Sequence, residues 1–235
     1  MMKQFLTLIA LLTFCAVVST SARASQSKTE VQDRLQTAAT TLHDLATAPD
    51  NGIPDEVYKS AKCVAVVPHM VKGAFIFGGK RGRGVATCRL PNGMWSAPAL
   101  FVITGGSWGL QAGAESIDLV MMVMTDEGMR HLLENKFQIG ADVSGAAGPV
   151  GRHASAGVDW KLDTQILTYS RSKGLFAGIN LDGSWIEHDT DSTVALYGKD
   201  YGNNDLLTGK VPVPPEAQTF ISEVARVKTE AEQRP

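Results

Sequence analysis

The sequence has few of the residues that form metal centres and thiol sites: its 235 residues include three cysteines and five histidines. The histidines are scattered, and none lies in an H-E-x-x-H pattern or another close ligand spacing. Cysteines without histidines clustered around them do not form a zinc site. We therefore predict that the chain holds no metal ion and no cofactor.

An excess of positive charge is also missing. The chain has 22 Lys and Arg residues against 24 Asp and Glu residues, which gives a formal net charge of −2 at pH 7. Non-specific nucleic-acid binding depends on many contacts between basic side chains and phosphates, so this balance argues against it. The same balance argues against a protein that is held on a membrane by charge alone.

Long apolar runs are absent except at the N-terminus, where residues 1–24 are typical of a secretory signal peptide. Lys3 is followed by an apolar run over residues 5–18, which is shorter than the roughly 20 residues of a membrane-spanning helix. Ala22-Arg23-Ala24 supplies the small residues of a cleavage site. We expect cleavage after Ala24 and a periplasmic or secreted protein that starts at Ser25.

Removal of the signal peptide changes both the charge and the cysteine count. Loss of Lys3 and Arg23 leaves 20 basic residues against 24 acidic ones, a net charge of −4. A lipoprotein acylated at Cys15 is disfavoured because Phe14 before it is not small. The mature chain keeps Cys63 and Cys88, and two cysteines in an oxidising compartment favour one disulfide. Two separate buried thiols are the alternative.

The remaining residues, 25–235, are predicted to form one domain of the α+β class. Apolar residues at three- and four-residue steps predict an amphipathic helix over 29–48, capped by Thr29, and a C-terminal helix over 214–230. Between them lie many short apolar runs that contain glycine, typical of a strongly curved antiparallel sheet or barrel. Shorter helices are predicted over 54–61, 125–134 and 191–197.

A basic, glycine-rich segment is the most informative candidate site. Strands over 73–77 and 84–89 are predicted to form a hairpin around residues 78–83. Consecutive glycines let backbone N–H groups converge on an anion, and the basic side chains add charge that suits a lipid phosphate. A solvated, charged hairpin tip is the alternative. The candidate head-group contacts are Lys72, Lys80, Arg81, Arg83 and Arg89, and the candidate close-approach glycines are Gly78, Gly79, Gly82 and Gly84.

One enzyme motif is present, and its context does not support catalysis. Residues 105–109 match G-x-S-x-G, with Ser107 as the candidate nucleophile. A nucleophile elbow needs a strand, a sharp turn and then a helix, whereas the residues after Ser107 predict another strand. No acid and histidine are placed to suggest a triad, so we predict no catalytic residue.

Several ordered blocks of the sequence resemble the SYLF domain family. The blocks cover roughly residues 30–200, in the order found in the family. They are 61–68 (AKCVAVVP), 72–75 (KGAF), 82–85 (GRGV), 95–98 (WSAP), 105–107 (GGS), 140–142 (GAD), 147–152 (AGPVGR) and 169–178 (YSRSKGLFAG).

The resemblance implies a lipid-binding domain without known catalysis. Eukaryotic relatives bind phosphoinositides and some bind actin, whereas bacterial relatives are mostly exported. Because this chain has a signal peptide and no SH3 or FYVE module, actin and intracellular phosphoinositides are disfavoured as partners.

We therefore expect a non-enzymatic, lipid-binding protein of the cell envelope. The basic hairpin would contact anionic phospholipid head groups, and apolar surface near Trp95 and Trp108 would meet acyl chains. The first alternative is a structural or partner-binding envelope protein whose glycine-rich sheet docks another protein. The second is a serine hydrolase that uses Ser107.

Overall fold

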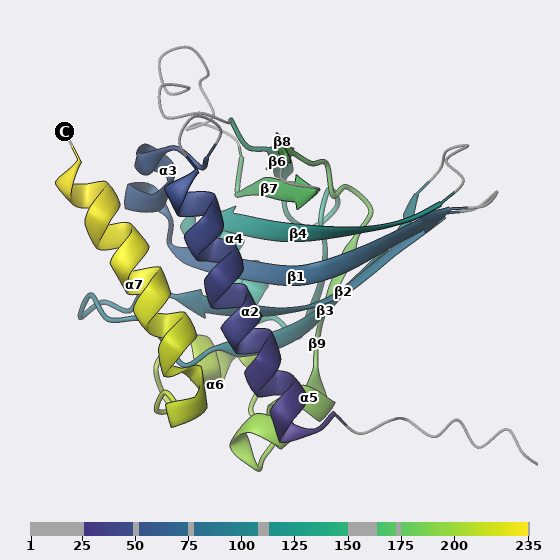
Figure 1. The fold of residues 1–235 in the computed structure, drawn as a ribbon. Coiled ribbons are helices and arrows are strands. Elements are labelled where there is room, and N and C mark those ends of the chain that lie inside the picture. The colour runs from purple at the N-terminus through teal and green to yellow at the C-terminus, as the bar shows by residue number, and fades with distance from the viewer. Residues whose placement is uncertain are drawn as a thin grey trace, which may run out of the picture.

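A nine-stranded β-sheet forms the centre of the structure (Figure 1). The computed structural model describes residues 26–48, 52–74, 78–107, 113–149, 164–172 and 175–234. The strands are β1 (Cys63–Ala74), β2 (Gly78–Cys88), β3 (Ala99–Ser107), β4 (Gly113–Val123), β5 (Lys136–Gln138), β6 (Gly145–Ala147), β7 (Ile166–Ser172), β8 (Leu175–Gly178) and β9 (Trp185–His188).

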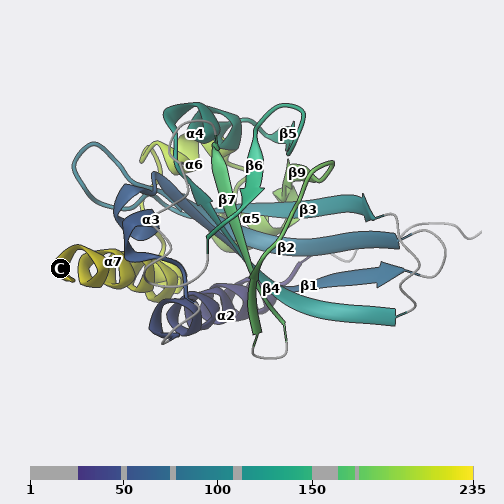
Figure 2. The same ribbon diagram turned by 90° about the horizontal axis from the view of Figure 1, so that it is seen from above.

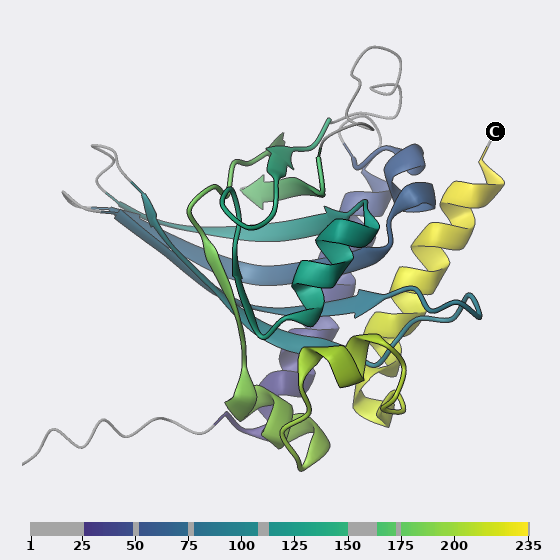
Figure 3. The same cartoon turned by 180° about the vertical axis from the view of Figure 1, so that it is seen from behind.

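Helices lie on both faces of this sheet (Figures 1 and 3). Within the described residues, none of them combines the length and the apolar character that a bilayer-spanning helix needs. The helices are α2 (Lys28–Thr47), α3 (Asp55–Ser60), α4 (Asp126–Leu133), α5 (Thr190–Tyr197), α6 (Asn203–Leu207), the 3₁₀ turn η3 (Pro215–Ala217) and α7 (Gln218–Gln233).

Four long antiparallel strands, in the order β3-β2-β1-β4, make up most of the sheet. β9 and then β5 extend it beyond β3, while β7 extends it beyond β4. The pairing of β6 with β7 is parallel, and the other strand pairs are antiparallel. The prediction of an α+β fold with a curved sheet and flanking helices is confirmed, in the form of an open sheet.

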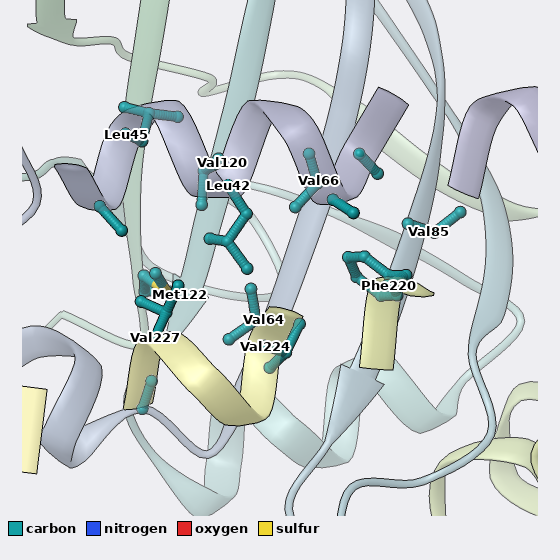
Figure 4. Packing of buried hydrophobic residues seen from close by; sticks show 14 of the residues in the cluster. Leu42, Leu45, Val64, Val66, Val85, Val120, Met122, Phe220, Val224 and Val227 are labelled. Carbon is teal, nitrogen blue, oxygen red and sulfur yellow. The ribbon is translucent and has the colours of Figure 1, made fainter. Parts of the chain in front are cut away.

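Helices α2 and α7 cover one face of the sheet and form the front core (Figure 4). Val64, Val66 and Val85 point from β1 and β2 toward these helices because alternate residues of a strand face the same side. The helices meet them with apolar residues at three- and four-residue steps. The buried helix residues include Val31, Leu35, Ala38, Leu42, Leu45, Phe220, Val224 and Val227.

The opposite face of the same strands forms the rear core. Ala65, Val67 and Leu119 face this side, where α4, α6, β5 and β9 cover them (Figure 3). Cys63 and Cys88 also lie here, directly opposite each other on β1 and β2, and they form the predicted disulfide. A cross-link over 25 residues stabilises a fold by about 3 kcal/mol.

The outer ends of β1–β4 continue beyond the helices as a four-stranded arm (Figure 2). We define the arm as residues 71–74, 78–81, 104–107 and 113–116. The last buried apolar side chains before it are Met70, Ile103 and Ile117, and the arm has none among its described side chains. The two apolar cores therefore end where the arm begins.

The two long helices agree with the predicted apolar pattern, but the residue that caps the first of them differs from the prediction. The helix predicted over 29–48 is α2, but Ser27 caps it in place of Thr29. The Ser27 hydroxyl accepts a hydrogen bond from the Glu30 N–H at 3.2 Å, and the Glu30 carboxylate accepts one from the Ser27 N–H at 2.8 Å. This reciprocal capping box begins the helix one residue earlier than predicted.

The predicted turn of the basic hairpin is wrong. Residues 78–83 lie inside β2, and Ala74 pairs with Gly78, so the connection between β1 and β2 is 75–77. A Cβ atom at Gly82 would overlap Val67, and one at Gly84 would overlap the ring of Phe101. These glycines therefore allow close packing within a strand. Local sequence alone does not distinguish glycines with this role from turn glycines.

Two further strand predictions also change. The strands predicted over 108–114 and 117–124 correspond, within the described residues, to the single strand β4, and the one predicted over 154–160 lies outside those residues. Asp182-Gly183 does form a turn, with Gly183 at φ 76°. It is not a hairpin turn, because β8 pairs with β7 while β9 pairs with β3.

Candidate functional site

The five candidate basic residues do not share one face of the sheet. Side chains alternate along β2, so Lys80 faces the rear side while Arg81 and Arg83 face the front side. Lys72 is opposite Lys80 in the register of β1 and β2 and shares its side. Arg89 lies just after β2, where it pairs with Trp95. The cations therefore occupy three separate places.

The first place is the lysine pair on the arm, Lys72 and Lys80. Within the residues that the structure describes, neither lysine has an ion-pair partner within 4 Å. Glu115 is opposite Lys72 on β4, and its carboxylate accepts a hydrogen bond from Ser172. Like charges on neighbouring strands repel each other, so the pair favours an anion that neutralises it.

Lys80 is unusually buried for an unpaired lysine, with 8% of its surface exposed. Its side chain lies over Gly105 of β3, where a Cβ atom would be only 2.6 Å from Lys80 Cε. Burial, together with the charge of Lys72, lowers the pKa of Lys80, and Asp182 opposes this shift. A buried, unpaired cation costs stability, a feature typical of binding sites.

The second place is a cleft of about 520 Å³ on the front side, lined by Arg81 and Arg83. We call it the Asp189 cleft. Val102 and Thr104 of β3 form its floor, and the start of α5 forms one wall. Its other lining residues are Gln26, Glu187, His188, Asp189, Thr190 and Asp191.

Asp189 joins three elements at this cleft. Its carboxylate accepts a hydrogen bond from the Ser192 N–H at 3.2 Å and so caps α5. Oδ2 lies 3.4 Å from Nη1 of Arg34 on α2 and 3.3 Å from Nε of Arg83 on β2. Burial lowers the pKa of the Arg34 guanidinium, and the charge of Asp189 opposes that effect. One buried carboxylate thus lies between two guanidinium groups.

Sequence reasoning missed Arg34 and Asp189, which lie 155 residues apart. One signal was available: Arg34 occupies the apolar stripe of α2 between Val31 and Leu35, where a charged residue needs a buried partner. Nothing in the sequence identified Asp189 as that partner.

The third place is a groove of about 530 Å³ between the turn over 89–95 and α7, which we call the Trp95 groove. Arg89 is at its rim, 3.9 Å from Glu232. Met94 is 62% exposed beside it, whereas Trp95 is mostly buried in the front core. The structure thus brings Arg89 and Trp95 together, while Trp108 lies outside the described residues.

The sequence that builds these elements matches a known protein family. Residues 104–227 match the family model described as "Ysc84: Las17-binding protein actin regulator". The chain belongs to the Ysc84 family. This confirms the resemblance to the SYLF domain that the sequence blocks predicted.

Curated relatives in the Ysc84 family come from yeast and mammals. Protein YSC84 of Saccharomyces cerevisiae is 35% identical over 175 residues, which cover 73% of this chain and 37% of that protein. The SH3 domain-containing YSC84-like protein 1 of Rattus norvegicus is 34% identical over 171 residues, covering 72% of this chain and 50% of the relative. The chain therefore spans half or less of the length of these relatives.

In this member of the Ysc84 family, the described residues around Ser107 do not have the order of elements found in a nucleophile elbow. Gly105, Gly106 and Ser107 lie in β3, and β4 begins at Gly113. The described residues that follow Ser107 are those of β4, which pairs with β1 as a strand, whereas an elbow requires a helix after the nucleophile. Across the described ranges, no three His, Cys, Asp or Glu residues are grouped to hold a metal ion.

The buried position of Asp189 generates a stability prediction. Asp189→Ala leaves Arg34 buried without its counter-charge and removes the cap of α5, so we expect the free energy of unfolding to fall by about 3 kcal/mol. Urea denaturation measures this change. Asp126→Ala, in the first turn of α4 with a carboxylate that is 84% exposed, is the control and should cost less than about 1 kcal/mol. Equal losses in the two variants would contradict the account.

Proposed function

We propose that the chain binds anionic lipid surfaces through the arm. The observation that carries this proposal is that Lys72 and Lys80 have no ion-pair partner among the described residues and lie in the part of the sheet beyond the two apolar cores. Arg81 is exposed on the other side of the same strand. Cations on both sides of a projecting structure can approach a negatively charged surface together.

The connections at the end of the arm add support from their sequence. Ala74 pairs with both Gly78 and Gly113, and Gly78 pairs with Ser107, so the four strands end side by side. The connections 75–77 and 108–112 lie outside the described residues, and their sequences are Phe-Ile-Phe and Trp-Gly-Leu-Gln-Ala. Aromatic and apolar residues next to Lys and Arg are typical of segments that bind the membrane interface.

The expected binding is reversible and depends on salt. Each basic residue near an anionic bilayer contributes about 1 kcal/mol, and this contribution falls off within a Debye length. The net negative charge of the chain opposes approach in other orientations. A few cations on the arm therefore orient the protein on the surface without holding it there permanently.

A second candidate function is docking of a protein partner. The description of the family model names a Las17-binding protein and an actin regulator, which favours a protein-binding role for this chain as well. We consider catalysis less favoured than both candidates, because Gly105, Gly106 and Ser107 lie within the strand β3. An exported chain would not meet actin, so actin is the less favoured partner.

We also propose that the protein works outside the cytoplasm, after cleavage behind Ala24. The disulfide between Cys63 and Cys88 supports this, because such bonds persist in oxidising compartments. N-terminal sequencing of the protein from the envelope or periplasmic fraction should give Ser25 as the first residue. A chain that starts at Met1 in the cytoplasmic fraction would refute the proposal.

Vesicle sedimentation tests the lipid-binding proposal. The wild-type protein should sediment with phosphatidylcholine vesicles that contain phosphatidylglycerol and not with phosphatidylcholine alone. Lys72→Gln with Lys80→Gln removes two cations from the arm, so we expect binding to weaken by about tenfold or more.

The matched control removes two exposed lysines elsewhere, Lys199→Gln with Lys210→Gln, and should bind like the wild type. Melting temperatures of both double variants check that each is folded. Equal weakening of binding in the two double variants would show that binding responds to net charge alone. Unchanged binding after loss of Lys72 and Lys80 would refute the proposal that the arm binds the membrane.

A further inference from the structure

The Asp189 cleft holds two opposite charges that have no ion-pair partner among the described residues. Among its lining residues, Arg83 pairs with Asp189, and Glu187 pairs with Lys136 at 2.6 Å. Within the described part of the chain, Arg81 and Asp191 have no ion-pair partner, although both line the same cleft. They are therefore too far apart to pair with each other directly.

A buried donor in the cleft is also unsatisfied. Nε of Arg83 is shielded from solvent and makes no hydrogen bond to any described residue, although it lies 3.3 Å from Oδ2 of Asp189. An unsatisfied buried donor costs free energy, so the Arg83 guanidinium, whose side chain is 37% exposed, gains from an acceptor in the open part of the cleft. By contrast, both ring nitrogens of His188 are in contact with polar partners, the side chains of Asn203 and Asp200.

The charges that line the cleft disfavour a simple ion of either sign. An isolated anion would meet Arg81 and Arg83 but also the carboxylates of Glu187, Asp189 and Asp191. An isolated cation would be attracted by these carboxylates but repelled by the guanidinium groups of Arg81 and Arg83. A molecule that carries both charges can satisfy the two unpaired side chains together.

We propose that the Asp189 cleft binds a small zwitterion that joins a phosphate to a primary ammonium group, as in phosphoethanolamine. The phosphate lies at the guanidinium groups of Arg81 and Arg83, and the ammonium lies at the Asp191 carboxylate. Guanidinium groups bind phosphate through charge-assisted hydrogen bonds, and a volume of about 520 Å³ suits a small ligand. The proposal does not depend on membrane binding by the arm.

Calorimetric titration of the processed chain with three soluble ligands tests the proposal. O-phosphoethanolamine should bind about tenfold more tightly than inorganic phosphate or ethanolamine, because only it engages both charges. Arg81→Gln should weaken O-phosphoethanolamine binding by about tenfold. Asp191→Asn should remove the preference over inorganic phosphate without weakening the binding of phosphate itself, because the carboxylate that is removed repels phosphate.

Control variants separate the cleft from general charge effects. Arg130→Gln and Asp126→Asn change exposed charges on α4 and should bind like the wild type. The arm variant Lys72→Gln with Lys80→Gln should also keep full affinity for O-phosphoethanolamine, which separates this proposal from the membrane proposal. Equal affinities for the three ligands, no binding at millimolar concentration, or an unchanged preference in Asp191→Asn would overturn it.

Vesicle sedimentation then distinguishes whether the natural ligand is a lipid head group or a free solute. If a lipid head group is the ligand, sedimentation should be stronger with phosphatidylethanolamine than with phosphatidylcholine, whose quaternary ammonium cannot donate a hydrogen bond. If the ligand is a free solute, the two vesicle types should sediment the protein equally. Once calorimetry has shown that O-phosphoethanolamine binds, either result supports a ligand site in the Asp189 cleft.

Discussion

Apolar contact on both faces of β1–β4 is the constraint on which the rest of the structure depends. Each of these strands sends alternate side chains to the front core under α2 and α7 and to the rear core under α4, α6 and β9. A strand with two buried faces must be apolar throughout, as β1 is from Cys63 to Val67. Where the helices end, that requirement ends, and glycine, lysine and arginine replace the apolar residues on the arm.

The same alternation determines which cations can act together. Lys72 and Lys80 share the rear side of the arm, while Arg81 faces the Asp189 cleft on the front side. The two lysines and the cleft are therefore neighbours on the same strands but face opposite sides, and Arg81 belongs both to the arm and to the cleft. Asp189 holds the cleft in place, because it connects α2 and β2 to the first turn of α5 through one buried carboxylate.

Local periodicity predicted the elements that are built from local contacts. The inner face of α2, the short helix α4 and the apolar face of α7 all follow from patterns within a few residues. The cysteine pair could be predicted because both cysteines lie on strands that are close in sequence. The turn between β1 and β2 could not, because Gly82 and Gly84 resemble turn glycines unless Val67 and Phe101 are known to pack on them. The Asp189 cleft likewise depends on contacts between residues more than a hundred positions apart.

The most direct test of the central claim is where the protein touches a membrane. An environment-sensitive fluorophore can be attached at Ser116→Cys on the arm or at Thr40→Cys on α2, both exposed positions, because the disulfide keeps Cys63 and Cys88 from reacting. With vesicles that contain phosphatidylglycerol, we predict a blue shift and quenching by nitroxide lipids at position 116 and no change at position 40. A response at position 40 without one at position 116 would contradict the account.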